Sequence, residues 1–163
     1  MKISITEHEE LVCIKAALHH IEATNERPDG RKRHDRSINF PGFVAQYAET
    51  IASEWVVARY LGVDYDPYDI KFKERADVGA NIEVKYTPYL EGTLIIHEYD
   101  RTSDVAVLVV GQSPHYEIRG WIPVAIAQKP KYRHSKQPNW WVSQINLQPI
   151  ENLKRSTYGQ SAI

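Results

Sequence analysis

The chain has 163 residues, of which 42% are hydrophobic and 25% are charged, and its formal net charge is −1. This composition is typical of a globular domain with its own core, and it excludes a protein that attracts polyanions through its overall charge. The single cysteine, Cys13, excludes an internal disulfide and a cysteine-based zinc site. No apolar run reaches the length of a membrane span and the N-terminus lacks the apolar stretch of a signal peptide, so we expect a cytoplasmic protein.

The first predicted helix covers residues 7 to about 24. Thr6 and Glu9 have the spacing of a capping box at its start. Large aliphatic residues then recur at helical spacing and predict its apolar face. That face consists of Leu11, Ile14, Leu18 and Ile21. His19 and His20 follow near the C-terminal end without a cluster of partner ligands, so we do not expect them to bind a metal.

A polar loop is predicted over residues 26–37, with five basic and three acidic residues. Two interpretations stay open for it. The loop is either a solvated connection or a basic arm that contacts phosphates. In the second case the contacts come from Arg31, Lys32 and Arg33.

A second long helix is predicted from Phe43 to Leu61, and Gly62 follows as its terminating residue. At about 100° per residue, Glu54 falls at the edge of the apolar stripe, where a carboxylate is costly unless it is paired or bound to a cation. Glu49 falls on a more mixed face, so Glu54 is the better candidate for an inward-facing acid. The alternative is that Glu54 extends from this edge into water. The stripe itself consists of Val44, Ala48, Ile51, Trp55 and Ala58.

Acidic residues surround Pro67 between residues 63 and 69. They predict an acidic turn rather than a calcium loop, because the glycine and the distant glutamate of such a loop are missing. A first strand is expected over residues 70–76.

The stretch of residues 77–85 carries the strongest functional pattern in the chain. Alternating apolar and polar residues predict a strand with Glu83 and Lys85 on one face. Gly79 permits a sharp reversal that brings Asp77 back beside Glu83. We therefore expect two carboxylates and one ammonium group to converge at one end of this strand.

Further strands are predicted downstream, together with a short helical turn at 123–128. The strands cover residues 93–97, 104–110, 116–122 and 140–142. The run at 104–110 is nearly all apolar, which is typical of a central strand buried on both faces. Residues 129–139 form a basic segment that either contacts phosphates or is merely exposed. Its cations are Lys129, Lys131, Arg133 and Lys136, with His134 beside them.

The order of these elements predicts one α/β or α+β domain whose central mixed β-sheet is flanked by helices. Residues 1–40 would form an N-terminal helix and basic loop, residues 41–155 the core, and residues 156–163 a frayed tail.

The acids and the lysine suit the hydrolysis of a phosphodiester. A divalent metal held by carboxylates activates water and neutralises charge on the phosphate, and Mg²⁺ needs only two or three protein acids because it keeps several waters. Asp77 and Glu83 would supply two ligands and the backbone carbonyl of Val84 a third. Glu54 would complete the site or bind a second metal or a water. Lys85 would orient the water, stabilise hydroxide or counter the phosphate charge, whereas proton abstraction by Lys85 is less favoured because the carboxylates keep it charged.

This constellation resembles the PD-(D/E)XK nuclease superfamily. The resemblance rests on Asp77, on Glu83-Val84-Lys85 and on the preceding helix with Glu54. Residues 53–62 look like the Glu-x-x-x-Ala-x-x-Leu-Gly helix of small members, including phage-borne ones. Ala76 stands where the family name has proline, at a position that is loose in the family. The downstream segments with the same look are 119–122 and 147–149, and the resemblance covers roughly residues 42–150.

The resemblance implies a restriction-endonuclease-like core, Mg²⁺ or Mn²⁺ in a cleft, and a nucleic-acid substrate, with DNA favoured by family habit. Since one such site cuts one strand, cleavage of both strands would require a homodimer. No membrane partner is expected.

Three other interpretations were weighed against the nuclease. One is a non-catalytic nucleic-acid-binding or protein-interaction module on the same fold, which would use the basic segments. Another is an ordinary surface ion-pair cluster of Asp77, Glu83 and Lys85. A serine or histidine hydrolase is disfavoured because the sequence has no Gly-x-Ser-x-Gly elbow, and His97 is expected to be a satisfied polar residue rather than a catalytic one.

Overall fold

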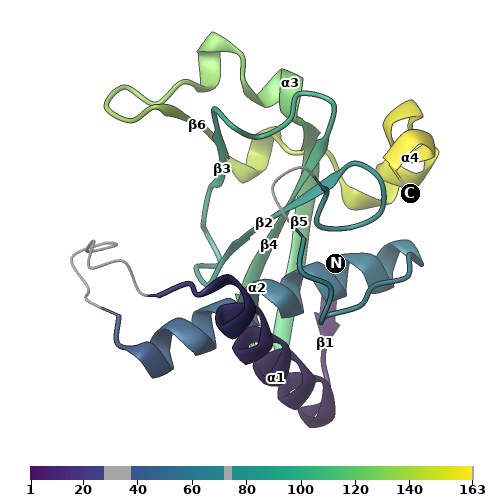
Figure 1. The fold of residues 1–163 in the computed structure, drawn as a ribbon. Coiled ribbons are helices and arrows are strands. Elements are labelled where there is room, and N and C mark those ends of the chain that lie inside the picture. Colours follow the sequence, from purple (N-terminus) through teal and green to yellow (C-terminus); the bar gives the residue numbers. More distant parts are fainter. Residues whose placement is uncertain (28–37, 72–74, 163) are drawn as a thin grey trace.

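The computed structural model describes residues 1–27, 38–71 and 75–162 (Figure 1). The predicted arm residues Arg31, Lys32 and Arg33 lie outside these ranges. The elements, in chain order, are β1 (Lys2–Ser4), α1 (Glu7–Thr24), α2 (Phe40–Leu61), β2 (Ile82–Thr87), β3 (Leu94–His97), β4 (Val105–Gln112), β5 (His115–Pro123), α3 (Val124–Ala127), η1 (Pro130–Tyr132), β6 (Asn139–Val142), η2 (Gln144–Asn146), η3 (Ile150–Arg155) and α4 (Thr157–Ala162).

The central sheet has the strand order β1-β5-β4-β2. Strands β2 and β4 run parallel, whereas β4 with β5 and β5 with β1 run antiparallel, so the sheet is mixed as predicted. Strand β4 is buried along its length up to Gly111, because its alternate residues enter two different cores. The prediction of a central strand buried on both faces is therefore confirmed, and β2 is left at an edge of the sheet.

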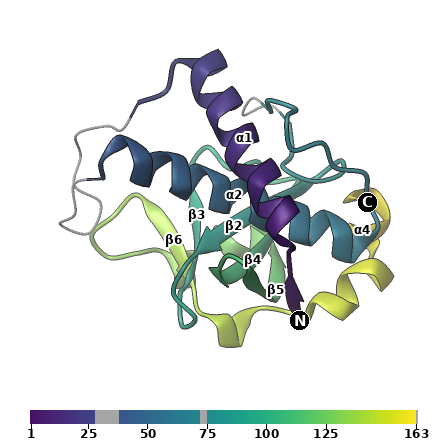
Figure 2. The same ribbon diagram turned by 90° about the horizontal axis from the view of Figure 1, so that it is seen from below.

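The two faces of the sheet are covered in different ways. Helices α1 and α2 cover one face, and the ribbon of β3 with β6, together with α3, covers the other (Figures 1 and 2). The expectation of a mixed α/β domain is confirmed. Flanking by helices holds for one face only, because the second apolar layer is supplied mainly by a two-stranded ribbon and a four-residue helix.

Helix α1 has the predicted start but buries a different face. Thr6 and Glu9 form the capping box, with the Thr6 amide 2.7 Å from Glu9 Oε2. Three of the four residues predicted to be buried are exposed: Leu11 by 45%, Ile14 by 44% and Leu18 by 40%. The face against α2 consists instead of Cys13, Ala16, Ala17, His20 and Ile21. Small residues there let two helices approach closely, and the longer side chains are turned outward.

Helix α2 begins three residues before the predicted start. Asn39 caps it by accepting a hydrogen bond from the Gly42 amide at 2.9 Å, and Pro41 in the first turn needs no helical partner for its nitrogen. The helix ends at Leu61 as predicted, because Gly62 adopts a φ of 74°.

Two other local predictions are wrong. Among the described residues of the segment 70–76, none belongs to a strand, because β2 pairs with β4 and no strand neighbours its open edge. The tail does not fray after residue 156: Thr157–Ala162 form α4, where Ser156 accepts a hydrogen bond from the Gly159 amide at 3.0 Å. Among the residues described, no helix is both long and apolar enough to cross a bilayer.

Candidate functional site

Strand β2 places its residues as the alternation predicted. Ile82 and Val84 are buried in the core beneath α1 and α2. Glu83 and Lys85 therefore point to the opposite face of the sheet, next to the ribbon. Because β2 is an edge strand, side chains from both faces can meet around its open side.

Asp77 is held against this open side by the predicted reversal. Val78 and Ile82 exchange two backbone hydrogen bonds, of 3.1 and 3.2 Å, around the turn that contains Gly79, whose φ is 59°. Asp77 Oδ2 then accepts a hydrogen bond of 2.7 Å from the Val84 amide. The Val84 carbonyl lies on the same side, because both backbone groups of one strand residue point toward the same neighbour.

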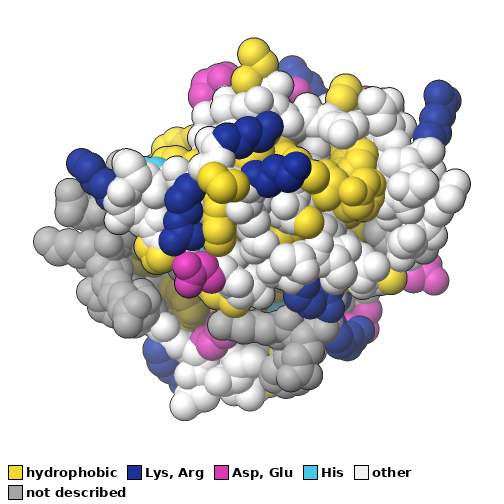
Figure 3. Space-filling model, turned by 90° about the horizontal axis from the view of Figure 1, so that it is seen from above, with side chains coloured by type: hydrophobic (Ala, Val, Ile, Leu, Met, Phe, Trp, Pro, Cys, Tyr) yellow, Lys and Arg dark blue, Asp and Glu magenta, His cyan; other side chains and the backbone are white. Residues whose placement is uncertain are grey.

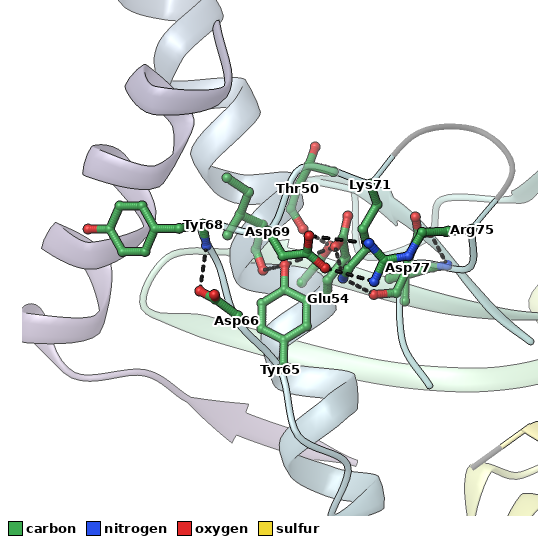
Figure 4. A network of polar contacts seen from close by, with 12 residues as sticks. Thr50, Glu54, Tyr65, Asp66, Tyr68, Asp69, Lys71, Arg75 and Asp77 are labelled. Carbon is green, nitrogen blue, oxygen red and sulfur yellow. Dashed lines mark hydrogen bonds and ion pairs between the residues drawn. The ribbon is translucent and has the colours of Figure 1, made fainter. Parts of the chain in front are cut away.

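Glu54 reaches the same region from α2 (Figure 4). Its Oε2 atom accepts hydrogen bonds from the Tyr65 hydroxyl at 2.9 Å and from Lys71 Nζ at 3.4 Å. Lys71 also donates to the backbone carbonyl of Asp77, so this lysine joins the two acids. Glu49 lies elsewhere and is bound by Tyr86, Tyr116 and the Ser113 amide. Of the two helix acids weighed from the sequence, Glu54 is the one beside Asp77.

The three acids act on one another electrostatically. Burial raises the pKa of Glu54 to about 7, against the opposing effects of Lys71 and Tyr65, and the charge of Glu83 adds to the rise. Burial, followed by the charges of Glu54 and Glu83, raises the pKa of Asp77 well above its ordinary value, while the Val84 amide and Lys85 oppose this. Buried acids with raised pKa values, as at Glu54 and Asp77, are typical of functional sites.

Lys85 is fixed between two carboxylates. Its Nζ atom lies 2.8 Å from Glu83 Oε1 and 3.0 Å from the Asp100 carboxylate. Burial works against its charge, but Glu83 and Asp100 outweigh that effect and raise the pKa of Lys85. The lysine is therefore a firmly held cation. Asp100 was not predicted; it lies in the turn after β3, where it also accepts a hydrogen bond from the His97 amide at 2.8 Å.

Two hollows open beside Asp77. The larger, of about 320 Å³, lies between the segment 64–71 and the turn 75–80, and the smaller, of about 120 Å³, lies against α1 and α2. Lys71, Asp69 and Asp77 line both hollows, and Glu54 lines the smaller one. Asp69 pairs with Arg75 at 2.9 Å at the surface. Asp77 therefore borders both hollows and Glu54 borders the smaller one, whereas Glu83 lines neither.

The donors that this region could offer to a metal are oxygen atoms. Within residues 1–27, 38–71 and 75–162, no group of three or more Asp, Glu, His or Cys side chains lies so that it could hold a metal ion. Asp77, Glu83 and Glu54 nevertheless offer oxygen donors, as does the Val84 carbonyl, and Mg²⁺ completes its shell with waters. Lys71 pairs with Glu54, and Lys85 pairs with Glu83 and Asp100.

The predicted basic residues that the structure describes lie on the loop that enters β6. The Arg133 guanidinium stands 4.5 Å from the Trp140 ring centroid, and Lys131 Nζ stands 4.5 Å from that of Tyr132. Arg133 also approaches Glu98 at 3.4 Å. Figure 3, seen from the ribbon side, shows Lys and Arg side chains beside exposed hydrophobic ones. Cations next to aromatic rings suit contacts with both phosphates and bases. The cations of this loop are Lys129, Lys131, Arg133 and Lys136.

Comparisons of the chain with models of protein families, with curated proteins and with solved structures found no match. The function is therefore inferred from the geometry and chemistry of the described residues alone.

Proposed function

We propose that the protein is a metal-dependent nuclease of the PD-(D/E)XK type, which hydrolyses phosphodiester bonds of nucleic acid, with DNA as the expected substrate. The observation that carries this proposal is that Lys71 binds both Glu54 and the Asp77 carbonyl, while the Asp77 carboxylate binds the amide of Val84, the residue between Glu83 and Lys85, at the open edge of the sheet. Like charges in a buried place are costly unless a cation offsets them.

The residues of the proposed site would have two roles, metal binding and positioning of the water or phosphate. Asp77, Glu83, Glu54 and the Val84 carbonyl would hold Mg²⁺ or Mn²⁺. When bound there, either ion supplies Lewis-acid stabilisation of the phosphoryl charge and makes water more acidic. Lys85, kept protonated by Glu83 and Asp100, donates hydrogen bonds to the attacking water or to a phosphate oxygen and keeps its own proton.

A cleavage panel tests this proposal. Single-stranded, double-stranded and branched DNA, and RNA, are incubated with the protein in Mg²⁺, in Mn²⁺ and in EDTA. We expect cleavage in the metals only, and a loss of about 100-fold or more in Lys85→Ala and Asp77→Ala. Lys15→Ala, on the exposed side of α1, is the matched control. Undiminished cleavage by both site variants would mean that the site is assigned wrongly.

The panel also reports on assembly. Since one site cuts one strand, a monomer is expected to nick duplex DNA, and a double-strand break would require a homodimer. Sedimentation at the protein concentration of the cleavage assay measures whether the protein is a monomer or a dimer, and this is compared with the nicked or broken product.

A second candidate is a non-catalytic nucleic-acid-binding module. It is favoured by the ion pairs that Lys71 and Lys85 already make with Glu54, Glu83 and Asp100, which offset part of the acidic charge without any metal, and by the basic loop before β6. Calorimetry with Mg²⁺ or Mn²⁺ separates the two candidates. Salt-sensitive DNA binding without metal binding would favour the module.

A further inference from the structure

Lys71 has a position that the Glu-x-Lys pattern does not account for. It belongs to the connection between α2 and β2, yet its Nζ atom lies 3.4 Å from Glu54 Oε2 and donates to the carbonyl of Asp77. The ammonium also stands 4.1 Å from the Tyr65 ring centroid. Its side chain is only 15% exposed, as is that of Glu54. Figure 4 shows Lys71 beside Glu54 and Asp77.

These partners are two oxygen atoms and the face of an aromatic ring, all of which interact favourably with a cation. Both oxygen atoms belong to residues near the proposed metal position. Lys85 does not supply this charge, because its ammonium is bound by Glu83 and Asp100 on the other face of the sheet. Lys71 is therefore the positive group nearest to Glu54 among the described ion pairs of the site.

The charge balance of the cluster leaves room for one divalent ion. Four carboxylates face two ammonium groups, so the ionised cluster keeps two negative charges. A divalent ion that binds Glu54 would meet Lys71 at Oε2 and be repelled by it, and Lys71 also lies at the backbone carbonyl of Asp77. Lys71 also lines the larger hollow, which gives its side chain space to withdraw. The carboxylates are Glu54, Asp77, Glu83 and Asp100, and the ammonium groups are Lys71 and Lys85.

We propose that Lys71 is the resident counter-ion of the acid cluster, and that a divalent metal must displace it from Glu54 in order to bind. This inference rests on the proposed function, because it assumes that the cluster binds metal. It makes Lys71 a positioning residue that sets the metal affinity, distinct from Lys85, which faces the reacting water.

Direct binding of Mn²⁺, measured by electron paramagnetic resonance and calorimetry without nucleic acid, tests the inference. Lys71→Met removes the charge and keeps the length of the side chain, and we expect it to bind Mn²⁺ about tenfold more tightly than the unchanged protein. Lys71→Arg keeps the charge and is expected to bind no more tightly. Arg75→Gln is the matched control: it removes one cation from the larger hollow without touching Glu54, and its affinity is expected to change by less than about threefold.

Thermal melting gives a second readout if Lys71→Met is unstable without metal. In EDTA this variant leaves the carboxylate of Glu54 without its cation, so its melting temperature is expected to fall, and Mn²⁺ is expected to raise it more than in the unchanged protein. Equal affinities and equal metal-induced shifts for the unchanged protein and Lys71→Met would overturn the inference while leaving the nuclease proposal standing. Absence of Mn²⁺ binding in every variant would overturn both.

Discussion

Glu49 and Glu54 lie on the same helix, and their partners give them different roles. Glu49 accepts hydrogen bonds from the hydroxyl groups of Tyr116 and Tyr86, at 2.8 and 3.1 Å, and lies 3.2 Å from the Ser113 amide. It therefore ties α2 to strands β2 and β5 and to the turn between β4 and β5. Glu54 instead faces Lys71 and the hollows beside Asp77.

We predict that Glu49→Ala destabilises the fold by about 2 to 3 kcal/mol, because the Tyr116 hydroxyl and the Ser113 amide lose their acceptor, while the Tyr86 hydroxyl keeps the Gly111 carbonyl at 2.9 Å. Urea unfolding at pH 7 measures this change. Gln46→Ala, an exposed change on the same helix, is the control and is expected to stay within about 0.5 kcal/mol. A loss of metal binding with unchanged stability in Glu49→Ala would instead point to Glu49 as the site acid.

The raised pKa of Glu54 makes stability depend on pH. Its value is about 7 in the folded protein against 4.5 ordinarily, so the folded state binds its proton more tightly than the unfolded state does. The favourable contribution is therefore complete below pH 4.5 and is lost as pH rises through 7. In EDTA, we expect the unfolding free energy of the unchanged protein, relative to Glu54→Gln, to fall by about 2 to 3 kcal/mol between pH 5 and pH 8. Parallel curves for the two proteins would contradict the assigned environment of Glu54.

At the scale of elements, helix α1 shows what a sequence pattern can and cannot specify. Its start follows from local chemistry, since the capping box needs only Thr6 and Glu9. Its buried face depends on the neighbouring helix α2, against which Cys13, Ala16 and Ala17 are buried together with His20 and Ile21. The pattern of large aliphatic residues pointed to Leu11, Ile14 and Leu18, whereas alanines fill the interface.

This packing predicts opposite outcomes at two adjacent positions of α1. Ala17 is fully buried, so Ala17→Leu is expected to overpack the contact with α2 and cost about 1 to 3 kcal/mol. Leu18 is 40% exposed, so Leu18→Ala is expected to change stability by no more than about 0.5 kcal/mol. Chemical denaturation of the two variants measures both. The reverse order of effects would mean that α1 packs through its larger residues after all.

Strand β2 and the segment before it also differ in how well the sequence predicted them. The alternation at residues 82–86 specified which side chains face the helices, and the structure agrees. The strand expected at 70–76 is absent among its described residues, since a strand requires a partner and the open edge of β2 has none beyond the bridge between Val78 and Ile82. Local preference cannot supply that information.

At the scale of the whole molecule, the site residues that are close together in the sequence could be predicted, whereas those brought in from distant segments could not. Asp77, Glu83 and Lys85 lie within nine positions, so a turn and a period of two suffice to bring them together. Asp100 reaches Lys85 only because β3 and its turn pack over β2, and Lys71 reaches Glu54 only because its connection folds back over α2. Asp100 lies three positions after the predicted strand 93–97 and Glu98 lies directly after it, so the sequence did not single out Asp100.

The net charge of −1 means that nucleic acid must be attracted by a local surface, and the loop before β6 is the described candidate. We predict that changing Lys129, Lys131 and Lys136 together to glutamine lowers the salt dependence of DNA binding by about 2 in the slope of log K against log salt, because each phosphate contact contributes about 0.7 to 0.9. Fluorescence anisotropy in EDTA, at several salt concentrations, measures the slope without cleavage.

The matched control for this prediction removes the same number of charges elsewhere. Exposed lysines on β1, α1 and η3 provide it: Lys2, Lys15 and Lys154. If binding depended on overall charge, both triple variants would lose the same slope, because each changes the net charge by three. If the loop before β6 makes the contacts, only the first variant loses it, and DNA then lies across the ribbon on the sheet face to which Glu83 and Lys85 point.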